Sequence, residues 1–210
     1  MMTWTTNKIS IIILLLIIVF AGSQSCGERT LIRHYYILEA TEDSLAFLQD
    51  SVHSKGICEI LRVHIPPAYD QQRIAVRRRS HEISYYQYHY WAMNPADNLT
   101  TLLEKQVRGS QIFTFASSGN MNMVPDYQIS SNVYKLEVED INDQFQVSLE
   151  MRMEFIAYAS GNTVLTHRVE RKKALEERDL NLFASELSQI FQEETSQFIS
   201  KISSYLNEMN

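Results

Sequence analysis

A stretch in the last third of the chain alternates strictly between apolar and polar side chains, and this pattern constrains the fold more than any other feature. The apolar positions are Phe145, Val147, Leu149, Met151, Met153, Phe155 and Ala157. Such alternation indicates an antiparallel strand with one face in the core and the other in water. Turn-forming residues flank it, Asn142–Asp143 before and Ser160–Gly161–Asn162 after. Together with expected strands at 132–141 and 164–171, it predicts a three-stranded meander.

The rest of the chain mixes strand and helix patterns. β-branched and aromatic residues predict further strands at 31–40, 57–65, 73–79, 82–92 and 111–117, and 41–55 is expected to hold a short helical turn. Asn94–Pro95 is expected to begin one helix, and Asp179 to cap a long amphipathic helix at the end. We therefore expect an α/β (α+β) fold: a two-layer domain with a mixed β-sheet, a C-terminal β-meander and a long C-terminal amphipathic helix. That helix is expected to pack across the sheet; the alternative is a free helix that binds a partner.

The first 26 residues have the layout of an export signal. An apolar run at 11–21 follows a polar start whose one charge is Lys8, and small residues lead from there to Cys26. The run is shorter than the roughly 20 residues of a membrane-spanning helix and fits the about 7–15 residues of a signal-peptide core. Three interpretations remain open: cleavage before Cys26 with lipid on its sulfur, ordinary secretory cleavage near 22–25, and an uncleaved anchor.

We favour the first interpretation, although Ser23 stands where lipoprotein signals usually have a Leu-like residue, and Gln24 is also unusual. It predicts a lipoprotein-type signal peptide at 1–25 and a single domain at 26–210, a length that suits one hydrophobic core. Lipidation of Cys26 would leave Cys58 without a disulfide partner. The apolar surroundings of Cys58 in the sequence indicate a buried thiol rather than a reactive one.

Charge and motif content exclude several function classes. Residues 1–25 hold one Lys and no acid, so removing them changes the net charge from −6 to −7, whereas a nucleic-acid binder normally has a basic excess. The sequence has no phosphate-binding loop, no GxSxG motif and no metal-spaced Cys/His set. His81 and His89, on one expected strand, would lie roughly 26 Å apart at about 3.3 Å per residue. His64 and His167 are expected to be partly buried strand residues rather than general bases. Because the sequence contains no recognisable catalytic or metal-binding set, we expect no enzymatic activity, no metal and no cofactor.

Two groups of side chains are candidates for contact with a partner protein or an anionic lipid headgroup. The first consists of arginines expected on one strand face: Arg73, Arg77 and Arg79. The alternative is a solvated face in which these arginines pair weakly with acids such as Glu137, Glu139 or Glu150. The second group consists of tyrosines expected to share one face: Tyr86, Tyr88 and Tyr90. For these, the alternative is packing in the core or at the sheet edge.

The stretch from Leu61 to Val107 resembles the family of ABC-type transport auxiliary lipoproteins, which includes the paraquat-inducible lipoprotein group. The resemblance rests on four features: Pro66–Pro67 with Tyr69 after a strand, the strand Ile74–Ala75–Val76–Arg77, Trp91–Ala92 at the end of a hairpin, and a Leu-rich helix. It extends to YYIL at 35–38, and to VLTHRVE followed by the terminal helix. It therefore covers nearly all of the chain after Cys26.

This resemblance implies a non-enzymatic accessory of a transporter that moves lipids or other hydrophobic molecules between the two bacterial membranes. The implied partners are a mammalian-cell-entry (MCE)-type substrate-binding protein, the ABC permease and ATPase of the same system, and the membrane through a palmitate-type anchor at Cys26. The implied location is the periplasm-facing side of the cell envelope, with the outer membrane as the expected site. The alternative function is a periplasmic binding or envelope-assembly module unrelated to lipid transport. A homo-oligomer is compatible with both.

Overall fold

The computed structural model describes residues 31–40, 56–119 and 122–209. The chain divides into two units, Met1–Ile32 and Arg33–Asn210, and every described helix and strand lies within the second. The expected export signal, Cys26 and the expected helical turn at 41–55 lie outside the described residues.

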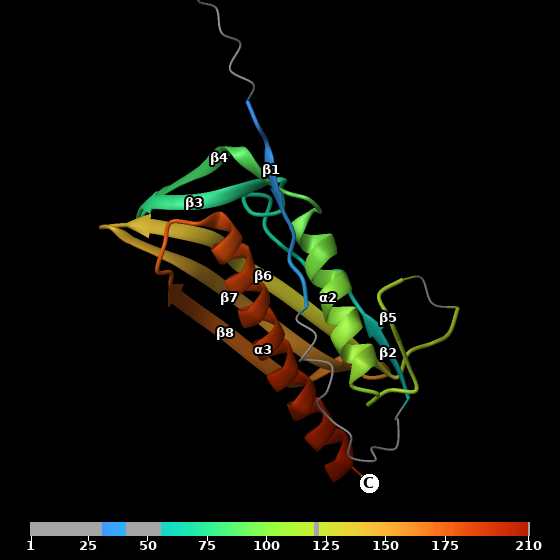
Figure 1. The fold of residues 1–210 in the computed structure, drawn as a ribbon. Coiled ribbons are helices and arrows are strands. Elements are labelled where there is room, and N and C mark those ends of the chain that lie inside the picture. Colours follow the sequence, from blue (N-terminus) through green and yellow to red (C-terminus); the bar gives the residue numbers. More distant parts are fainter. Residues whose placement is uncertain (1–30, 41–55, 120–121, 210) are drawn as a thin grey trace, which may run out of the picture. The chain divides into compact units, whose positions relative to one another are not determined.

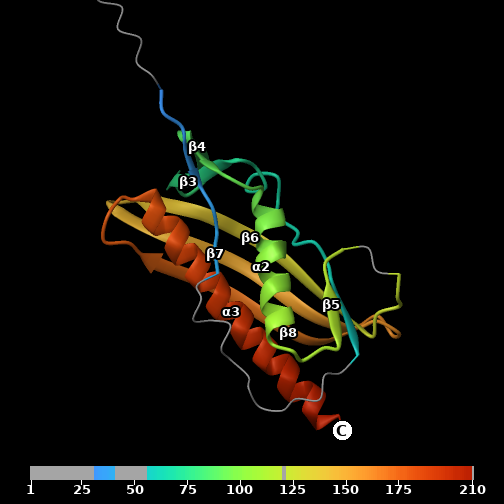
Figure 2. The ribbon, with the colours of Figure 1, turned by 45° about the vertical axis from the view of Figure 1, so that its right-hand side comes forward.

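The second unit contains an eight-stranded mixed sheet within the described part of the chain (Figure 1). Its strands are β1 (His34–Tyr36), β2 (Ile57–Ile60), β3 (Arg73–Arg79), β4 (Glu82–Trp91), β5 (Phe115–Ser117), β6 (Tyr127–Ile141), β7 (Gln144–Ala157) and β8 (Asn162–Ala174). Two helices, α2 (Pro95–Gly109) and α3 (Leu180–Glu208), lie on one face of the sheet (Figures 1 and 2). The predicted α/β class and its two layers are confirmed.

β6, β7 and β8 form the predicted C-terminal meander, with long antiparallel ladders between neighbours. Asn142 and Asp143 have φ values of 51° and 60°, which is the backbone that a two-residue type I′ hairpin turn requires. The alternating apolar positions from Phe145 to Phe155 are buried, as the pattern predicts. β6 begins at Tyr127 rather than at 132, so the meander is longer than the sequence indicates.

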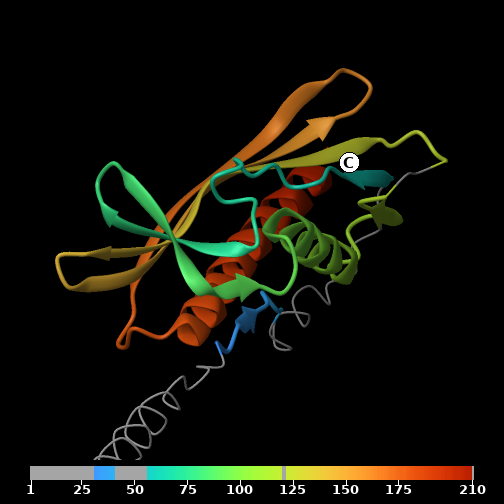
Figure 3. The same ribbon diagram turned by 90° about the horizontal axis from the view of Figure 1, so that it is seen from above.

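Two branches of the sheet meet on one edge of β6. Near its start, β6 pairs in parallel with β2, and β2 continues to β5. Near its end, β6 pairs in parallel with β3 through Val76↔Val138, and β3 continues to β4 and then β1. Figure 3 shows the β3–β4 hairpin at one end of β6 and β2 at the other.

Three of the predicted strands are shorter in the structure. β1 covers only part of 31–40, β5 covers only the end of 111–117, and β2 stops at Ile60 instead of residue 65. Beyond β2 the chain still follows β6, because the Leu61 N–H donates to the Ile129 carbonyl (2.9 Å) and His64 forms an isolated bridge with Asn132. Regular pairing is therefore lost before the Pro66–Pro67 turn.

Both helices begin at the predicted residues. The Asn94 side chain accepts the Ala96 N–H, with Pro95 in the first turn of α2, and the Asp179 side chain accepts two N–H groups at the start of α3. The α3 face toward the sheet is buried and includes Phe183, Leu187, Phe191, Phe198 and Ile202. The prediction of a terminal helix packed across the sheet is confirmed. Among the described residues, no helix combines the length and the apolar character needed to cross a membrane.

Candidate functional site

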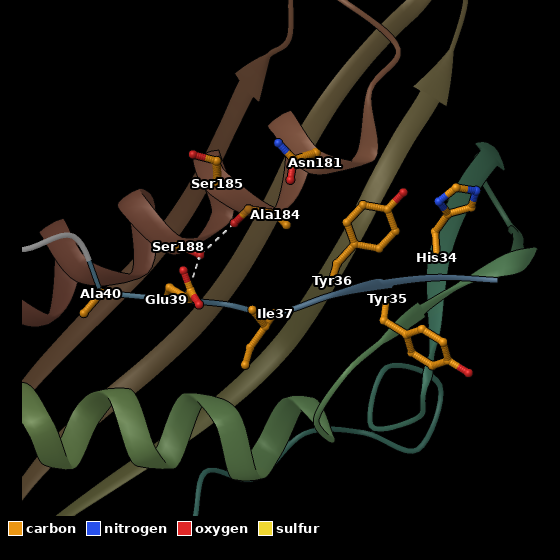
Figure 4. Close-up of a pocket in the computed structure, with 10 residues that line it drawn as sticks. All are labelled: His34, Tyr35, Tyr36, Ile37, Glu39, Ala40, Asn181, Ala184, Ser185 and Ser188. Atoms are coloured by element: carbon orange, nitrogen blue, oxygen red, sulfur yellow. Dashed lines mark hydrogen bonds between the residues drawn. The ribbon is translucent and has the colours of Figure 1, made fainter. Parts of the chain in front are cut away.

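β1 and β4 bring together two segments that are distant in the sequence. They pair in parallel, with the register His34↔His89, Tyr35↔Tyr90 and Tyr36↔Trp91. Because neighbouring side chains on a strand point to opposite faces, this pair has two different sides. On the helix-facing side, Trp91 meets Phe183 of α3 with ring centroids 5.9 Å apart. Figure 4 shows Tyr35 pointing away from His34 and Tyr36, toward the outer side.

The segment that follows β1 is held between the two helices. The Asn98 side chain of α2 accepts the Leu38 N–H and donates to the Leu38 carbonyl, both at 3.0 Å. The Glu39 N–H donates to the Ser188 hydroxyl of α3 at 3.2 Å (Figure 4). Leu38 itself is buried between these contacts. These bonds to α2 and α3 fix the position of β1 and its side chains.

A bulge in β4 separates the tyrosines that were predicted to share a face. The β3–β4 ladder shifts register where β4 approaches β1, and an extra residue in one strand reverses the alternation beyond it. The Tyr86 ring meets His89 on the helix-facing side (5.6 Å), whereas the Tyr90 ring stacks on Tyr35 on the outer side (5.6 Å). The prediction that Tyr86, Tyr88 and Tyr90 lie on one face is therefore wrong.

The helix-facing side carries an aromatic cluster of His34, Tyr36, Tyr86 and His89. The Tyr36 hydroxyl lies 2.9 Å from Nδ1 of His89, and the His34 and His89 rings stack at 5.0 Å. Burial and, second, the neighbouring His34 lower the pKa of His89, which favours the neutral imidazole, and Nδ1 of that form can accept a hydrogen bond from the Tyr36 hydroxyl. Burial is also the main cause that raises the pKa of Tyr36 and of Tyr86. The cluster therefore combines aromatic rings with polar atoms that can form hydrogen bonds.

Two hollows open beside this cluster. One, of about 560 Å³, is lined by Tyr36, Tyr86 and His89 together with charged side chains that include Arg78 and Arg178. The other, of about 780 Å³, lies between the β1 segment and the first half of α3 (Figure 4). Its α3 wall consists of short side chains, Asn181, Ala184, Ser185 and Ser188. Those short side chains leave room for a bound group on the helix-facing side of β1.

The outer side of the pair is basic and aromatic. The Arg33 guanidinium lies 5.8 Å from the Tyr90 ring centroid, within the range of cation–π attraction. Tyr35 is 59% exposed and Tyr85 36% exposed, and the register of β3 against β4 places Tyr85 and Arg73 on this same side. We call this group, Arg33, Tyr35, Arg73, Tyr85 and Tyr90, the outer aromatic face.

Arg77 belongs to a buried network instead of a free surface. Its Nε and Nη2 donate to the two carboxylate oxygens of Glu137 at 2.6 and 3.1 Å, and the Tyr69 hydroxyl donates to Oε2 at 2.9 Å. The Glu137 side chain has no exposed surface. The hydrogen bonds with Glu137 raise the pKa of Arg77. Burial, followed by the negative charge of Glu137, raises the pKa of Tyr69 to about 12. The alternative prediction of pairing with Glu137 is confirmed, but the pair is buried, not solvated.

The expected single arginine face does not form. β3 contains register irregularities on both sides of Arg77, and Arg79 forms an exposed ion pair with Glu82 at 3.5 Å. Arg73 stays exposed at the other end of the strand, beside Tyr90. The other two acids suggested as partners pair with lysines: Glu139 with Lys172 and Lys135, and Glu150 with Lys135.

A second buried network joins β8 to α3, and sequence reasoning missed it. Nε2 of His167 lies 2.8 Å from Glu194, and Nδ1 lies 2.8 Å from the Lys201 ammonium. An ammonium can only donate, so Nδ1 accepts and Nε2 carries the proton toward Glu194. Glu194 and Lys201 are seven positions apart, so they lie on one face of α3. The sequence signal for this network is the presence of these charged residues among the apolar residues of that face.

The remaining sequence predictions concern single residues. Cys58 is fully buried, as predicted, and burial followed by Glu59 raises the pKa of its thiol, so the thiol stays protonated. His167 is buried more completely than predicted, whereas His64 is exposed, so the prediction of partial burial is wrong for His64. Across the described ranges, no group of three His, Cys, Asp or Glu side chains is placed to hold a metal ion.

Comparisons with known proteins address the fold and the family. The family model for the ABC-type transport auxiliary lipoprotein component matches residues 36–198. Among solved structures, a Xanthomonas campestris protein of the DUF330 family is similar, with a TM-score of 0.69 and 13% identity over 84% of this chain and 98% of that one. An uncharacterized protein has a TM-score of 0.60 and 13% identity over 81% and 99% of the two chains. At such identity these structures support the fold alone. No curated protein matches the sequence.

Proposed function

We propose that this protein, which belongs to the family of ABC-type transport auxiliary lipoprotein components, is an envelope-anchored accessory subunit of an ABC-type transporter. The observation that carries the proposal is the extent of the family match. Residues 36–198 contain β2 to β8, α2 and most of α3, so the likeness involves the whole domain and not one motif.

The proposal includes a lipid anchor at Cys26 and a periplasm-facing position at the outer membrane. The apolar run at 11–21 and the small residues before Cys26 support it. Metabolic labelling with radioactive palmitate tests it: we expect label on the wild-type protein and none on Cys26→Ala. Cys58→Ala is the matched control and should keep the label. An unlabelled wild-type protein, or a labelled Cys26→Ala protein, would refute the anchor.

The proposed partners are an MCE-type substrate-binding protein and the permease and ATPase of the same system, and the proposed cargo is a lipid or another hydrophobic molecule. The resemblance from Leu61 to Val107 supports this assignment. The hollow between β1 and α3 supplies a contact surface with aromatic rings and short polar side chains on its walls. Tyrosine in particular is enriched at protein interfaces.

Site-specific photo-cross-linking in living cells tests these partners. A photoreactive residue at Ser185, on the wall of the hollow, should give adducts that mass spectrometry identifies as subunits of an ABC transporter. The matched position is Tyr158, an exposed residue after β7, where such adducts should be absent or much weaker. A membrane-attached protein whose Ser185 adducts contain no transporter subunit would overturn the proposal and favour the assembly-module alternative.

We further propose that the role is binding and not catalysis. The buried Glu137 carboxylate is paired with Arg77, and the buried His167 ring is paired with Glu194 on one side and with the exposed Lys201 on the other. On this proposal, Glu137→Gln and Glu194→Gln lower stability but leave transport unchanged for each molecule that folds. Loss of transport by a fully folded variant would contradict it.

A further inference from the structure

Positive charge and tyrosine are concentrated in one part of the fold. The segments 33–36 and 73–91, which form β1, β3, β4 and the β3–β4 turn, hold five arginines and a single acid, Glu82. The whole chain has a formal net charge of −6. The same segments hold six of its 11 tyrosines. This part of the fold therefore differs in charge and in composition from the rest of the molecule.

The outer aromatic face is the exposed portion of this region. Tyr35 stacks on Tyr90, and the Arg33 guanidinium lies against the same Tyr90 ring, so the three side chains form one contiguous surface. Arg73 is exposed and pairs with Tyr90 in the β3–β4 ladder. Within the described residues, neither Arg33 nor Arg73 forms an ion pair. The described part of the chain therefore leaves both positive charges open to a ligand that carries negative charge.

The length of chain before β1 limits how far this face can lie from the membrane. Arg33 follows Cys26 by seven residues (33 minus 26). Even fully extended, a segment of that length spans at most about 25 Å at ~3.6 Å per residue. With Cys26 anchored as proposed above, the first residues of the folded unit therefore stay close to the lipid surface.

We propose that the outer aromatic face rests on the membrane that holds the anchor. Its arginines would contact anionic headgroups, which attract basic groups close to the surface. Its tyrosines would lie at the headgroup level, where the amphipathic tyrosine ring is favoured. This inference rests on the proposed lipid anchor at Cys26. The contact gives the folded unit a defined orientation, because it directs the helix-facing side of β1 and its two hollows away from the lipid.

Headgroup quenching on reconstituted protein tests the contact. The full-length lipidated protein is placed in vesicles of phosphatidylcholine mixed with phosphatidylglycerol, with a fluorophore on Tyr35→Cys or, as the matched control, on Tyr158→Cys. The buried, protonated Cys58 does not compete for the label. A nitroxide on the lipid headgroup should quench the label at position 35 strongly and the label at position 158 little. Equal quenching at the two positions would overturn the inference.

A charge-reversal variant separates this inference from the anchor itself. Arg33→Glu combined with Arg73→Glu should lose most of the quenching at position 35 while the protein stays with the vesicles. Arg168→Glu, at an exposed position on β8, should leave quenching unchanged. Undiminished quenching in the double variant would refute a headgroup contact made by these arginines. Wild-type protein that does not stay with the vesicles would instead refute the anchor and, with it, the proposed function.

Discussion

Replacing Glu137 by Gln tests how strongly the fold depends on the buried carboxylate where β3 meets β6. The Glu137 side chain has no exposed surface and accepts three hydrogen bonds, two from Arg77 and one from Tyr69. The substitution keeps the shape but removes the charge and turns one acceptor into a donor that faces other donors. The Arg77 side chain, only 17% exposed, is then left without its counterion.

The expected loss follows from this burial. Breaking a buried ion pair by removing one partner costs about 3–5 kcal/mol. Arg77 keeps a hydrogen bond to the Ser80 carbonyl (3.0 Å) and some access to water, so we expect the lower end, about 3 kcal/mol. The exposed pair of Arg79 and Glu82 is the internal comparison, and Arg79→Ala should cost less than about 1 kcal/mol.

Urea unfolding followed by circular dichroism measures both losses, and urea is preferred because guanidinium would screen the charges. A double-mutant cycle with Arg77→Met, Glu137→Leu and their combination isolates the pair. Apolar side chains at both positions leave no unpaired charge, so the combination should cost less than the sum of the single changes. The reasoning is refuted if Glu137→Gln costs no more than Arg79→Ala, or if the cycle shows no coupling.

Three further predictions concern the core, alkaline pH and a glycine. Phe191→Ala, at a position 1% exposed, should lower the free energy of unfolding by about 3–5 kcal/mol; a urea-measured loss below about 1 kcal/mol would mean that α3 is not docked on the sheet. The pKa of Tyr69 is raised from 10.0 to about 12, so its contribution to stability is present below pH 10 and is lost as pH rises through 12. Tyr69→Phe should make the urea midpoint fall less steeply over that range, and an unchanged slope would contradict the assignment. Gly56→Ala should destabilise more than Gly161→Ala in thermal unfolding: both have positive φ, but only at Gly56 would the new Cβ meet a carboxylate oxygen of Asp126, at 2.6 Å. Equal shifts in Tm would show that this contact relaxes freely.

The parts of the fold that sequence reasoning predicted well are those determined by neighbours along the chain. The β6–β7 turn at Asn142–Asp143 and the caps at Asn94 and Asp179 depend on local backbone and side-chain chemistry. The alternation from Phe145 to Phe155 depends only on which face is buried. These signals can be read from short stretches of sequence, and the packing of the folded chain keeps the local structure that they predict.

The candidate site was harder to predict because it is formed by residues distant in sequence. Nothing in the residues around Tyr36 indicates a parallel pairing with β4. The bulge between Tyr86 and Tyr90 is not visible in the order of the residues, but it places their side chains on opposite faces of the strand. The burial of Glu137 depends on Tyr69 from a loop and Arg77 from a different strand. These features depend on which strands become neighbours, and that is a property of the complete sheet.

The position of β6 has a consequence for the order in which the chain acquires its structure. β2 and β3 both precede their common partner by a long stretch of sequence, so a growing chain exposes their edges before Tyr127–Ile141 has been made. The β6–β7–β8 segment, joined by tight turns, can form its contacts locally and therefore quickly. We therefore expect β6–β7–β8 to form first and to serve as the template on which β2 and β3 pair. A chain that ends before Tyr127 carries unpaired strand edges, which are the usual starting points of aggregation.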